Sequence, residues 1–202
     1  MGTTEEECEL QYSDGEDAVE DVEEEDGWDD KPHRITMDGL YLGSMDAANN
    51  LEVLQQKGIT HILMVGEGLE PSLVNYGFKY MHIKVDDVPE EDLVAHFPKA
   101  FEFIDQVCTG DNAICTQGGG VLVHCVAGVS RSATVCIGWL MCRRGYHLDE
   151  ARKIVHAARP WILPNKGFML QLQELQRLQC DLTKWRAWRH LWHGMHKGSK
   201  SS

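Results

Sequence analysis

Residues Val121–Thr134 have the sequence VLVHCVAGVSRSAT, and three kinds of local structure follow from it. Val121–Cys125 is a short apolar run of high β propensity, as in a buried strand. Small residues then form a turn, and Ser130–Arg143 is an apolar segment that Gly145 should end as a helix. The stretch therefore predicts a strand that leads through a tight turn into the N-terminus of a helix.

The turn separates Cys125 from Arg131 in a C-x5-R pattern. Because the chain must curl before it enters the helix, we expect the backbone N–H groups of residues 126–131 to point toward one centre. Gly128 permits backbone conformations that other residues resist, and the planar guanidinium of Arg131 can hold two phosphate oxygens. The turn therefore predicts a phosphate-binding site made by Val126, Ala127, Gly128, Val129, Ser130 and Arg131.

Cys125 lies where a helix N-terminus and an arginine favour the thiolate over the thiol. A thiolate held in line with phosphorus is the nucleophile that phosphate transfer requires. The bare spacing is a weak signal, because Cys180 and Arg186 repeat it. Their spacer has no glycine and follows a helical segment, so this second pair is a chance match. The prediction depends on the whole context of strand, turn and apolar helix.

Strand-like and helix-like segments alternate along the rest of the chain. Short strands are expected at 39–42, 60–65 and 79–85. Helices are expected at 46–57, 91–107 and 148–159, and a long helix is expected from Asn165 toward Lys184. This alternation predicts an α/β domain with a central, mostly parallel sheet of four to five strands flanked by helices.

An acidic tail, residues 1–31, precedes the periodic sequence. Positions 1–30 hold 15 Asp and Glu and no Lys or Arg, a composition that predicts disorder. The tail accounts for the net charge of −13, because the other residues hold 17 acidic and 19 basic side chains. A nearly neutral folded part lacks the basic field that nucleic-acid binding needs, so no nucleic-acid partner is expected.

The expected domain covers residues 32–180, and residues 181–202 form a basic extension rich in tryptophan. Trp185, Trp188 and Trp192 recur at helical spacing. The extension either continues the last helix over the core or forms a basic amphipathic surface for a partner or a membrane. Contact with the acidic tail, as an intramolecular brake, is a further hypothesis from the opposite charges.

The seven cysteines are odd in number, irregularly spaced and without a C-x-x-C pair. This pattern argues against a disulfide scaffold and against a cysteine zinc site. It favours a reducing compartment, either the cytoplasm or the nucleus. Free thiols, buried or in loops, are expected at Cys108, Cys115, Cys136 and Cys142, and one of them could protect Cys125 from oxidation as a disulfide.

The chain resembles the dual-specificity protein phosphatases, a branch of the protein tyrosine phosphatase superfamily. The resemblance covers roughly residues 34–178 and implies a phosphatase-like three-layer domain of the small, atypical type, without metal or other cofactor. It is carried by GLYLGSMDAANN at 39–50, GITHIL at 58–63, IKVDD at 83–87, HCVAGVSRSAT at 124–134 and RPWILPNKGFMLQL at 159–172.

The resemblance also implies roles for single residues. Cys125 would form a phosphocysteine intermediate, Arg131 would stabilise the charged transition state, and Ser132 would help the thiolate leave in the second step. His124 resembles a residue that tunes the thiolate, with a packed strand-end histidine as the alternative. Asn165 either braces the loop or caps a helix.

A general acid must protonate the leaving oxygen and then activate water. The family places an aspartate about forty residues before the cysteine, which leaves Asp86 and Asp87 and favours Asp87. The acidic residues 90–92 that follow are expected to start a helix. Met64 departs from the family pattern, which usually has asparagine near the end of that strand.

The expected substrates are phosphoproteins, a protein kinase among them, that carry phosphotyrosine or phosphoserine and phosphothreonine. The variable loop positions hold no lysine, which disfavours a phosphoinositide substrate. Two further functions would use the same turn from Cys125 to Arg131. One is an RNA 5′-triphosphatase, which the nearly neutral domain disfavours, and the other is a phosphoprotein-binding module without catalysis. Membrane contact through residues 181–202 stays a secondary hypothesis.

Overall fold

The computed structural model describes residues 30–108 and 119–197, with side chains up to residue 189. In this part of the chain a single sheet has the strand order β1-β2-β5-β3-β4. The strands are β1 (His33–Arg34), β2 (Leu40–Gly43), β3 (Ile59–Val65), β4 (Lys79–Ile83) and β5 (Gly120–His124). Only the β1–β2 pair is antiparallel, which confirms the predicted sheet.

The central strand β5 is buried along its whole length, as its apolar sequence predicts. Gly43 of β2 and Met64 of β3 both pair with His124 at the end of β5. The carboxyl ends of these three parallel strands therefore meet at one edge of the sheet, where Cys125 leaves β5. Ligands of open α/β sheets bind outside this edge.

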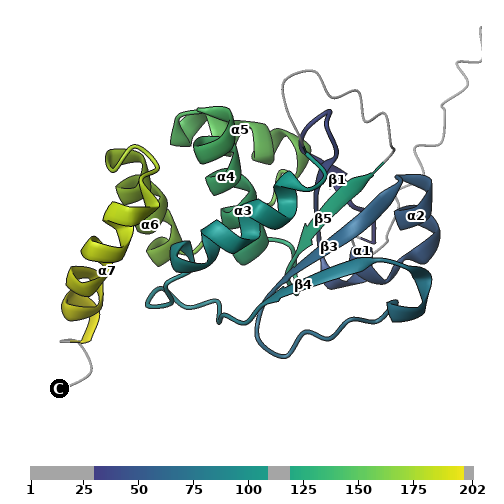
Figure 1. Cartoon of the computed structure of the whole chain (residues 1–202), viewed down its shortest axis with the longest axis horizontal. Helices are drawn as coiled ribbons and strands as arrows, with labels where there is room; N and C mark the ends of the chain where they lie inside the picture. Colours follow the sequence, from purple (N-terminus) through teal and green to yellow (C-terminus); the bar gives the residue numbers. More distant parts are fainter. Residues whose placement is uncertain (1–29, 109–118, 198–202) are drawn as a thin grey trace, which may run out of the picture.

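Helices cover both faces of the sheet (Figure 1). On one face lie the short helices α1 (Met45–Asn49) and α2 (Leu51–Gln56). On the other face lie α3 (Phe97–Asp105), α4 (Arg131–Arg144), α5 (Leu148–Ala158) and α6 (Lys166–Arg177), with α7 (Leu182–Lys197) outside α6. Two 3-10 turns, η1 (Val74–Tyr76) and η2 (Val94–His96), complete the elements. The result is the expected layered α/β domain.

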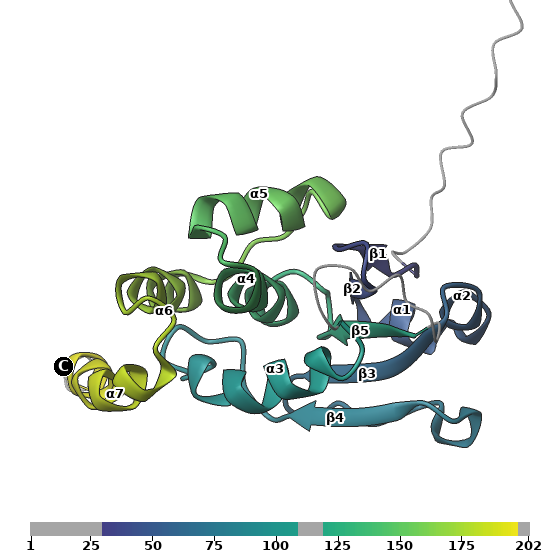
Figure 2. The same ribbon diagram turned by 45° about the horizontal axis from the view of Figure 1, so that its top comes forward.

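Helix α4 lies at the centre of the larger core and is buried on nearly all sides (Figure 2). Its Gly138 lies so close to Phe97 of α3 that an added Cβ would come within 2.3 Å of the Phe97 ring. Trp139 of α4 is fully buried and donates a hydrogen bond to Asp105 at the end of α3, at 2.8 Å. This tight packing fixes the helix whose N-terminus carries the candidate site.

Two of the predicted helices differ in the structure: one is divided, and one starts later. The helix expected at 46–57 divides into α1 and α2, because the Asn50 side chain accepts a hydrogen bond from Val53 N, at 3.2 Å, and so caps α2. The helix expected at 91–107 starts later, with η2 and then α3. Just before η2, Asp92 Oδ1 accepts a hydrogen bond from Ala95 N, at 3.2 Å.

The long helix expected from Asn165 toward Lys184 is also wrong. It ends as α6, because Gln179 and Cys180 adopt left-handed backbone conformations with φ of 54° and 59°. Asp181 then accepts hydrogen bonds from Thr183 N and Lys184 N, which start the separate helix α7. The C-terminal extension is therefore a new helix that packs its Trp185 against the domain, not a continuation of α6.

Several expectations lie outside the described residues, including the acidic tail up to residue 29 and Cys115. The side chain of Trp192 is also outside them. Among the helices of the described segments, none has the length and apolar content to cross a membrane.

Candidate active site

The turn between β5 and α4 is held from outside through its carbonyl groups. The carbonyl of Val126 accepts from Met45 N at 2.9 Å, and that of Val129 accepts from Leu163 N at 2.9 Å. Arg159 donates from Nε to the Gly128 carbonyl at 2.7 Å and from a terminal nitrogen to the Ala127 carbonyl at 2.9 Å. Because the carbonyls face outward, the amides of the turn face inward.

Those inward amides form an uncapped helix N-terminus. Among the described residues, no acceptor takes the amide hydrogens of Val126, Ala127, Val129 and Ser130. Ser130 occupies the cap position of α4 but makes no side-chain capping bond. Free amides at a helix N-terminus bind anions. The predicted phosphate site is therefore present as a geometry that an oxyanion can fill.

The sulfur of Cys125 lies at the base of this turn, and the residue is 2% exposed. Gly128 N donates to it at 3.2 Å, and the Ser132 hydroxyl donates to it at 3.1 Å. Both bonds are stronger to a thiolate than to a thiol, because hydrogen bonds to charged acceptors gain more energy. The structure thus brings the predicted nucleophile and Ser132 together.

Gly128 is required by both its backbone and its surroundings. Its φ of +66° is the left-handed conformation that side chains resist. An added Cβ would lie 2.5 Å from the Gly43 carbonyl oxygen and 2.7 Å from a guanidinium nitrogen of Arg159. No residue other than glycine fits the turn without displacing β2 or Arg159.

Arg131 returns over the turn from the first residue of α4. A terminal nitrogen donates to the Val85 carbonyl at 3.3 Å, and Nε lies 3.7 Å from Asp87 Oδ2. This buried Nε makes no hydrogen bond to any described residue. Gly66 makes room for the guanidinium, because a Cβ there would lie 2.6 Å from its nitrogen. A buried donor without a partner fits an arginine that awaits a phosphate oxygen.

Asp86 and Asp87 are both exposed, but of the two only Asp87 makes hydrogen bonds to the turn and to Asn165 among the described residues. The Oδ1 atom of Asp87 accepts from the Ser130 hydroxyl at 2.7 Å and from Asn165 Nδ2 at 2.8 Å. The side chain keeps 34% of its surface exposed, so a substrate can reach it. Of the two candidate acids, the geometry therefore favours Asp87, although its role in the reaction stays a prediction.

Asn165 fulfils both of its predicted alternatives. Its Oδ1 caps α6 by accepting from Phe168 N at 3.0 Å, while its Nδ2 holds Asp87. Its backbone N also donates to the Ser130 hydroxyl at 3.1 Å. One residue thus connects α6, the turn and the candidate acid.

His124 is buried, and burial together with the nearby His82 lowers its pKa to about 4. Its Nδ1 lies 3.2 Å from the Cys125 carbonyl oxygen and must donate, because a carbonyl only accepts. The histidine is therefore neutral at pH 7 and orients the backbone of Cys125 without adding a positive charge. Met64, its partner residue on the neighbouring strand β3, is buried in the core.

The sequence interpretation gave no role to Arg159. It is fully buried, it holds two carbonyls of the turn, and its guanidinium lies 4.8 Å from the centre of the Trp161 ring. The only local signal is an arginine before a proline in a segment of the family resemblance. Its target lies 31 residues away in sequence, at Gly128, so no local pattern could reveal the contact.

One cysteine prediction is wrong. Cys142 is not a free thiol, because it forms a disulfide with Cys180. The same bond rules out the second C-x5-R pair as a site, as predicted. Cys108 and Cys136 are free and buried as expected, and burial raises the pKa of the Cys136 thiol.

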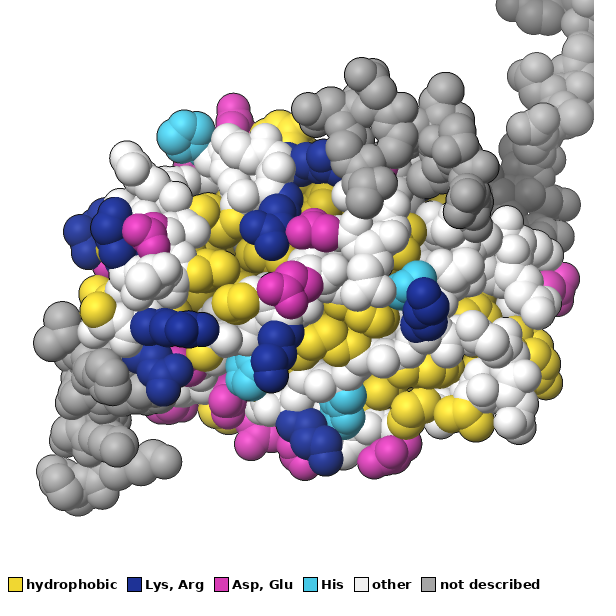
Figure 3. Space-filling model, viewed as in Figure 1, with side chains coloured by type: hydrophobic (Ala, Val, Ile, Leu, Met, Phe, Trp, Pro, Cys, Tyr) yellow, Lys and Arg dark blue, Asp and Glu magenta, His cyan; other side chains and the backbone are white. Residues whose placement is uncertain are grey.

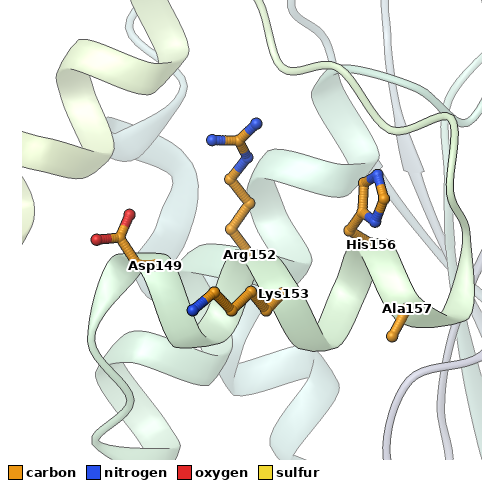
Figure 4. A pocket seen from close by; sticks show the side chains of 5 residues that line it. All are labelled: Asp149, Arg152, Lys153, His156 and Ala157. Carbon is orange, nitrogen blue, oxygen red and sulfur yellow. The ribbon is translucent and has the colours of Figure 1, made fainter.

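Two surface hollows lie away from the sulfur of Cys125. One, of about 470 Å³, runs along α5 and is lined by Asp149, Arg152, Lys153, His156 and Ala157 (Figure 4). The other, of about 610 Å³, lies between the segment after Asp87 and α7 and is lined by Val88, Glu90, Glu91, Asp92, Ala95, His96, Lys99 and Arg189. Neither contains Cys125 or Arg131. The described residues contain no group of three or more His, Cys, Asp or Glu side chains placed to hold a metal.

Residues 40–178 match the family model described as dual specificity phosphatase, catalytic domain. Dual specificity protein phosphatase 19 of Mus musculus is 45% identical over 137 residues, which are 68% of this chain and 59% of that protein. Dual specificity protein phosphatase 1B of Arabidopsis thaliana is 39% identical over 139 residues, 69% of this chain and 78% of that protein. The chain thus matches less than two thirds of the mouse relative.

Solved structures show the same fold. Human DUSP28 has a TM-score of 0.63 at 35% identity, over 73% of this chain and 95% of that one. The human tyrosine phosphatase-like serine/threonine/tyrosine-interacting protein has a TM-score of 0.64 at 35% identity, over 73% of this chain and 96% of that one. The family match covers β2–β5, the turn and α4–α6, and it ends before α7.

Proposed function

Because the chain belongs to the dual specificity phosphatase family, we propose that it hydrolyses phosphotyrosine and phosphoserine or phosphothreonine in proteins through a phosphocysteine intermediate. One observation carries the proposal. The sulfur of Cys125 lies beneath amides that no described residue accepts, beside an arginine whose Nε has no hydrogen-bond partner there. These are the groups that a phosphate dianion requires.

In the first step, the Cys125 thiolate attacks phosphorus as the bond to the leaving oxygen breaks. The proton of the Asp87 carboxyl moves to that oxygen, which leaves as a phenol or an alcohol. In the second step, the Asp87 carboxylate takes a proton from water, and the water oxygen displaces the thiolate as inorganic phosphate forms. The Ser132 hydroxyl, 3.1 Å from the sulfur, stabilises the departing thiolate.

The turn stabilises both transition states by electrostatics. The three equatorial oxygens gain negative charge as they face the inward amides, and the Arg131 guanidinium donates hydrogen bonds to these oxygens. These donors are fixed before the substrate binds, because the outward carbonyls are already bonded. A preorganised site avoids the cost of turning dipoles during the reaction.

Dual specificity is supported by the shallow position of the turn. Val126 is 46% exposed, and Leu163, whose backbone holds the turn, is 70% exposed. A site close to the surface admits the short side chains of phosphoserine and phosphothreonine as well as phosphotyrosine. The apolar rim suits a protein substrate better than a highly charged lipid headgroup.

A phosphoprotein-binding module without catalysis is the second candidate. It is favoured by the likeness to a human protein whose name calls it phosphatase-like and interacting. Cys125, Arg131 and Asp87 are all present and in contact with one turn, which supports the enzyme instead. On the face shown in Figure 3, acidic and basic side chains are interspersed, so this face offers no basic track for an RNA substrate.

The deciding experiment is hydrolysis of 4-nitrophenyl phosphate and of phosphopeptides that carry each of the three phosphorylated residues. The wild type should hydrolyse all of them, and Cys125→Ser should reduce every rate to background. Trapping of a phosphoenzyme by acid quench would identify the intermediate. Equal rates for wild type and Cys125→Ser, with retained binding of phosphopeptides, would establish the binding module.

A further inference from the structure

The segment that carries Asp87 continues through residues 88–92 to the start of η2, and α6 supports it from one side. The Glu91 carbonyl accepts from Gln171 Nε2 at 2.6 Å, and Gln171 is fully buried. Gly167 lies against Pro89 so closely that an added Cβ would be 1.9 Å from the Pro89 carbonyl oxygen. Helix α6 therefore holds the middle of this acid segment, residues 86–92.

The far end of the acid segment is held by α7. Asp92 is 8% exposed, and its Oδ1 accepts from the indole Nε1 of Trp185 at 3.0 Å. Trp185 is 1% exposed, and its ring centre lies 4.8 Å from that of Trp188. A buried hydrogen bond to a carboxylate is among the stronger ones in a protein. Helix α7 lies outside the residues matched by the family model, which end at 178.

The hydrogen bond from Trp185 to Asp92 is one contact between α7 and the end of the acid segment. Between Val88 and Arg189 the two are separated by the hollow of about 610 Å³ described above. The hydrogen bond from Trp185 to Asp92 therefore connects α7 to the acid segment beside this hollow. Loss of this bond would weaken the attachment of the end of the segment to α7.

We infer that Trp185 is a positioning residue for Asp87: through Asp92 it holds the acid segment where the Asp87 carboxyl can protonate the leaving oxygen. The inference rests on the proposed function. Proton transfer requires the acid to lie within hydrogen-bond distance of the leaving oxygen. Displacement of a catalytic group by about 1 Å can reduce a rate on the order of a hundredfold. A restraint five residues from Asp87 can therefore affect the rate.

The test compares leaving groups in the Trp185→Phe variant. Phenyl phosphate needs a proton on its leaving oxygen, whereas 4-nitrophenolate leaves well without one. We expect kcat/KM for phenyl phosphate to fall roughly threefold to tenfold more than kcat/KM for 4-nitrophenyl phosphate. In an Asp87→Asn background the same substitution should have no leaving-group effect, because the acid is already gone.

Trp139→Phe is the matched control. It removes the same kind of bond, from a buried indole to the carboxylate of Asp105, between α3 and α4. It should lower the unfolding temperature and leave the ratio of the two substrates unchanged. If Trp185→Phe does not fold, benzothienylalanine at position 185 keeps the ring shape and replaces the N–H by sulfur.

An equal loss on both substrates in the Trp185 variants would overturn the inference and reduce Trp185 to a structural role. So would a leaving-group effect of the same size in Trp139→Phe. Both of these results would leave the proposed function intact if Asp87→Asn still lowers kcat/KM for phenyl phosphate more than kcat/KM for 4-nitrophenyl phosphate. Hydrolysis by Cys125→Ser at the wild-type rate would overturn both.

Discussion

The turn proposed to bind phosphate, residues 125–131, and the acid segment, residues 86–92, meet through the contacts of Asp87 with Ser130 and Arg131 but are stabilised differently. The turn is fixed through its backbone carbonyls, which bond to groups from α1, the end of α5 and the segment before α6. The acid segment depends on side chains, namely those of Ser130, Asn165, Gln171 and Trp185.

This difference separates two requirements of the reaction. The oxyanion needs donors that do not move, and backbone bonds from several elements supply that rigidity. The acid must reach substrates with different leaving oxygens, and support by single side chains allows adjustment. It follows that substitutions near the turn should affect all substrates, whereas substitutions near the acid segment should affect substrates selectively.

The largest expected effect comes from Gly128→Ala, which forces a Cβ against the Gly43 carbonyl at a φ of +66°. The turn must open, which removes several inward amides at once. Loss of one such donor costs on the order of a hundredfold to a thousandfold in rate. We therefore expect kcat/KM to fall by at least about a thousandfold on every substrate.

Gly145→Ala is the control for Gly128→Ala. It has a similar φ of +72° but no atom within 4 Å of the added Cβ. It should cost about 1 kcal/mol of stability, measured by urea unfolding, and leave the rates unchanged. Similar rate losses in both variants would show that the backbone conformation, and not the crowded turn, is responsible.

A second prediction concerns the disulfide that connects α4 to the start of α7. Cys142 and Cys180 close a loop across a sequence separation of 38. A loop of this size predicts about 4 kcal/mol of stabilisation, which reduction should remove, so the urea midpoint should be lower after reduction. Because the bond lies away from the turn, kcat/KM for 4-nitrophenyl phosphate should change less than about twofold.

The control for the disulfide is Cys142→Ser, measured with and without dithiothreitol. It should match the reduced wild type in both conditions. If reductant lowers the stability of Cys142→Ser as well, another cysteine pair is responsible, and α7 is not anchored by this bond.

A third prediction tests the outward support of the turn. Arg159→Met keeps much of the side-chain volume but leaves the Ala127 and Gly128 carbonyls without their donors. Each buried carbonyl left unpaired costs about 1–3 kcal/mol, part of which the turn can avoid by rotating. We expect kcat/KM and the affinity for orthovanadate to fall together by roughly thirtyfold.

Arg152→Met is the control for Arg159→Met. Arg152 is exposed on α5, the helix that ends just before Arg159, and it lines the hollow along that helix (Figure 4). It should leave both rate and affinity unchanged. A loss of rate in Arg159→Met without a loss of vanadate affinity would contradict the proposed role of the outward carbonyl bonds.

The two regions also differ in how far the sequence predicts them. The signals of the turn are local, because a strand, Gly128 and the spacing from Cys125 to Arg131 lie within fourteen residues. The sheet followed from the alternation of strands and helices, and its order is that of a parallel α/β domain. Local physical rules were sufficient there.

The supports of the acid segment could not be predicted in the same way. Gln171 and Trp185 are 80 and 93 residues from their partners, and no periodicity connects them. The break before α7 was missed because Gln179 and Cys180 are not typical of left-handed turns. Only the cap at Asp181 left a local signal.

The smallest of the predicted effects is a change in stability with pH, and it tests whether His124 is neutral in the folded protein. Burial lowers the pKa of His124 to about 4, whereas the unfolded chain has the ordinary value near 6.5. The unfolded state therefore binds more protons below pH 6.5, so stability falls as the pH drops from about 6.5 toward 4. Between pH 7 and pH 5 the wild type should lose about 2 kcal/mol from this residue, and His124→Asn should lose that much less. Urea unfolding at both pH values gives the difference. Parallel pH dependence in the two proteins would contradict the prediction, because it would mean that folding does not lower the pKa of His124 and that the histidine takes up a proton near pH 6.5 in the folded state as well.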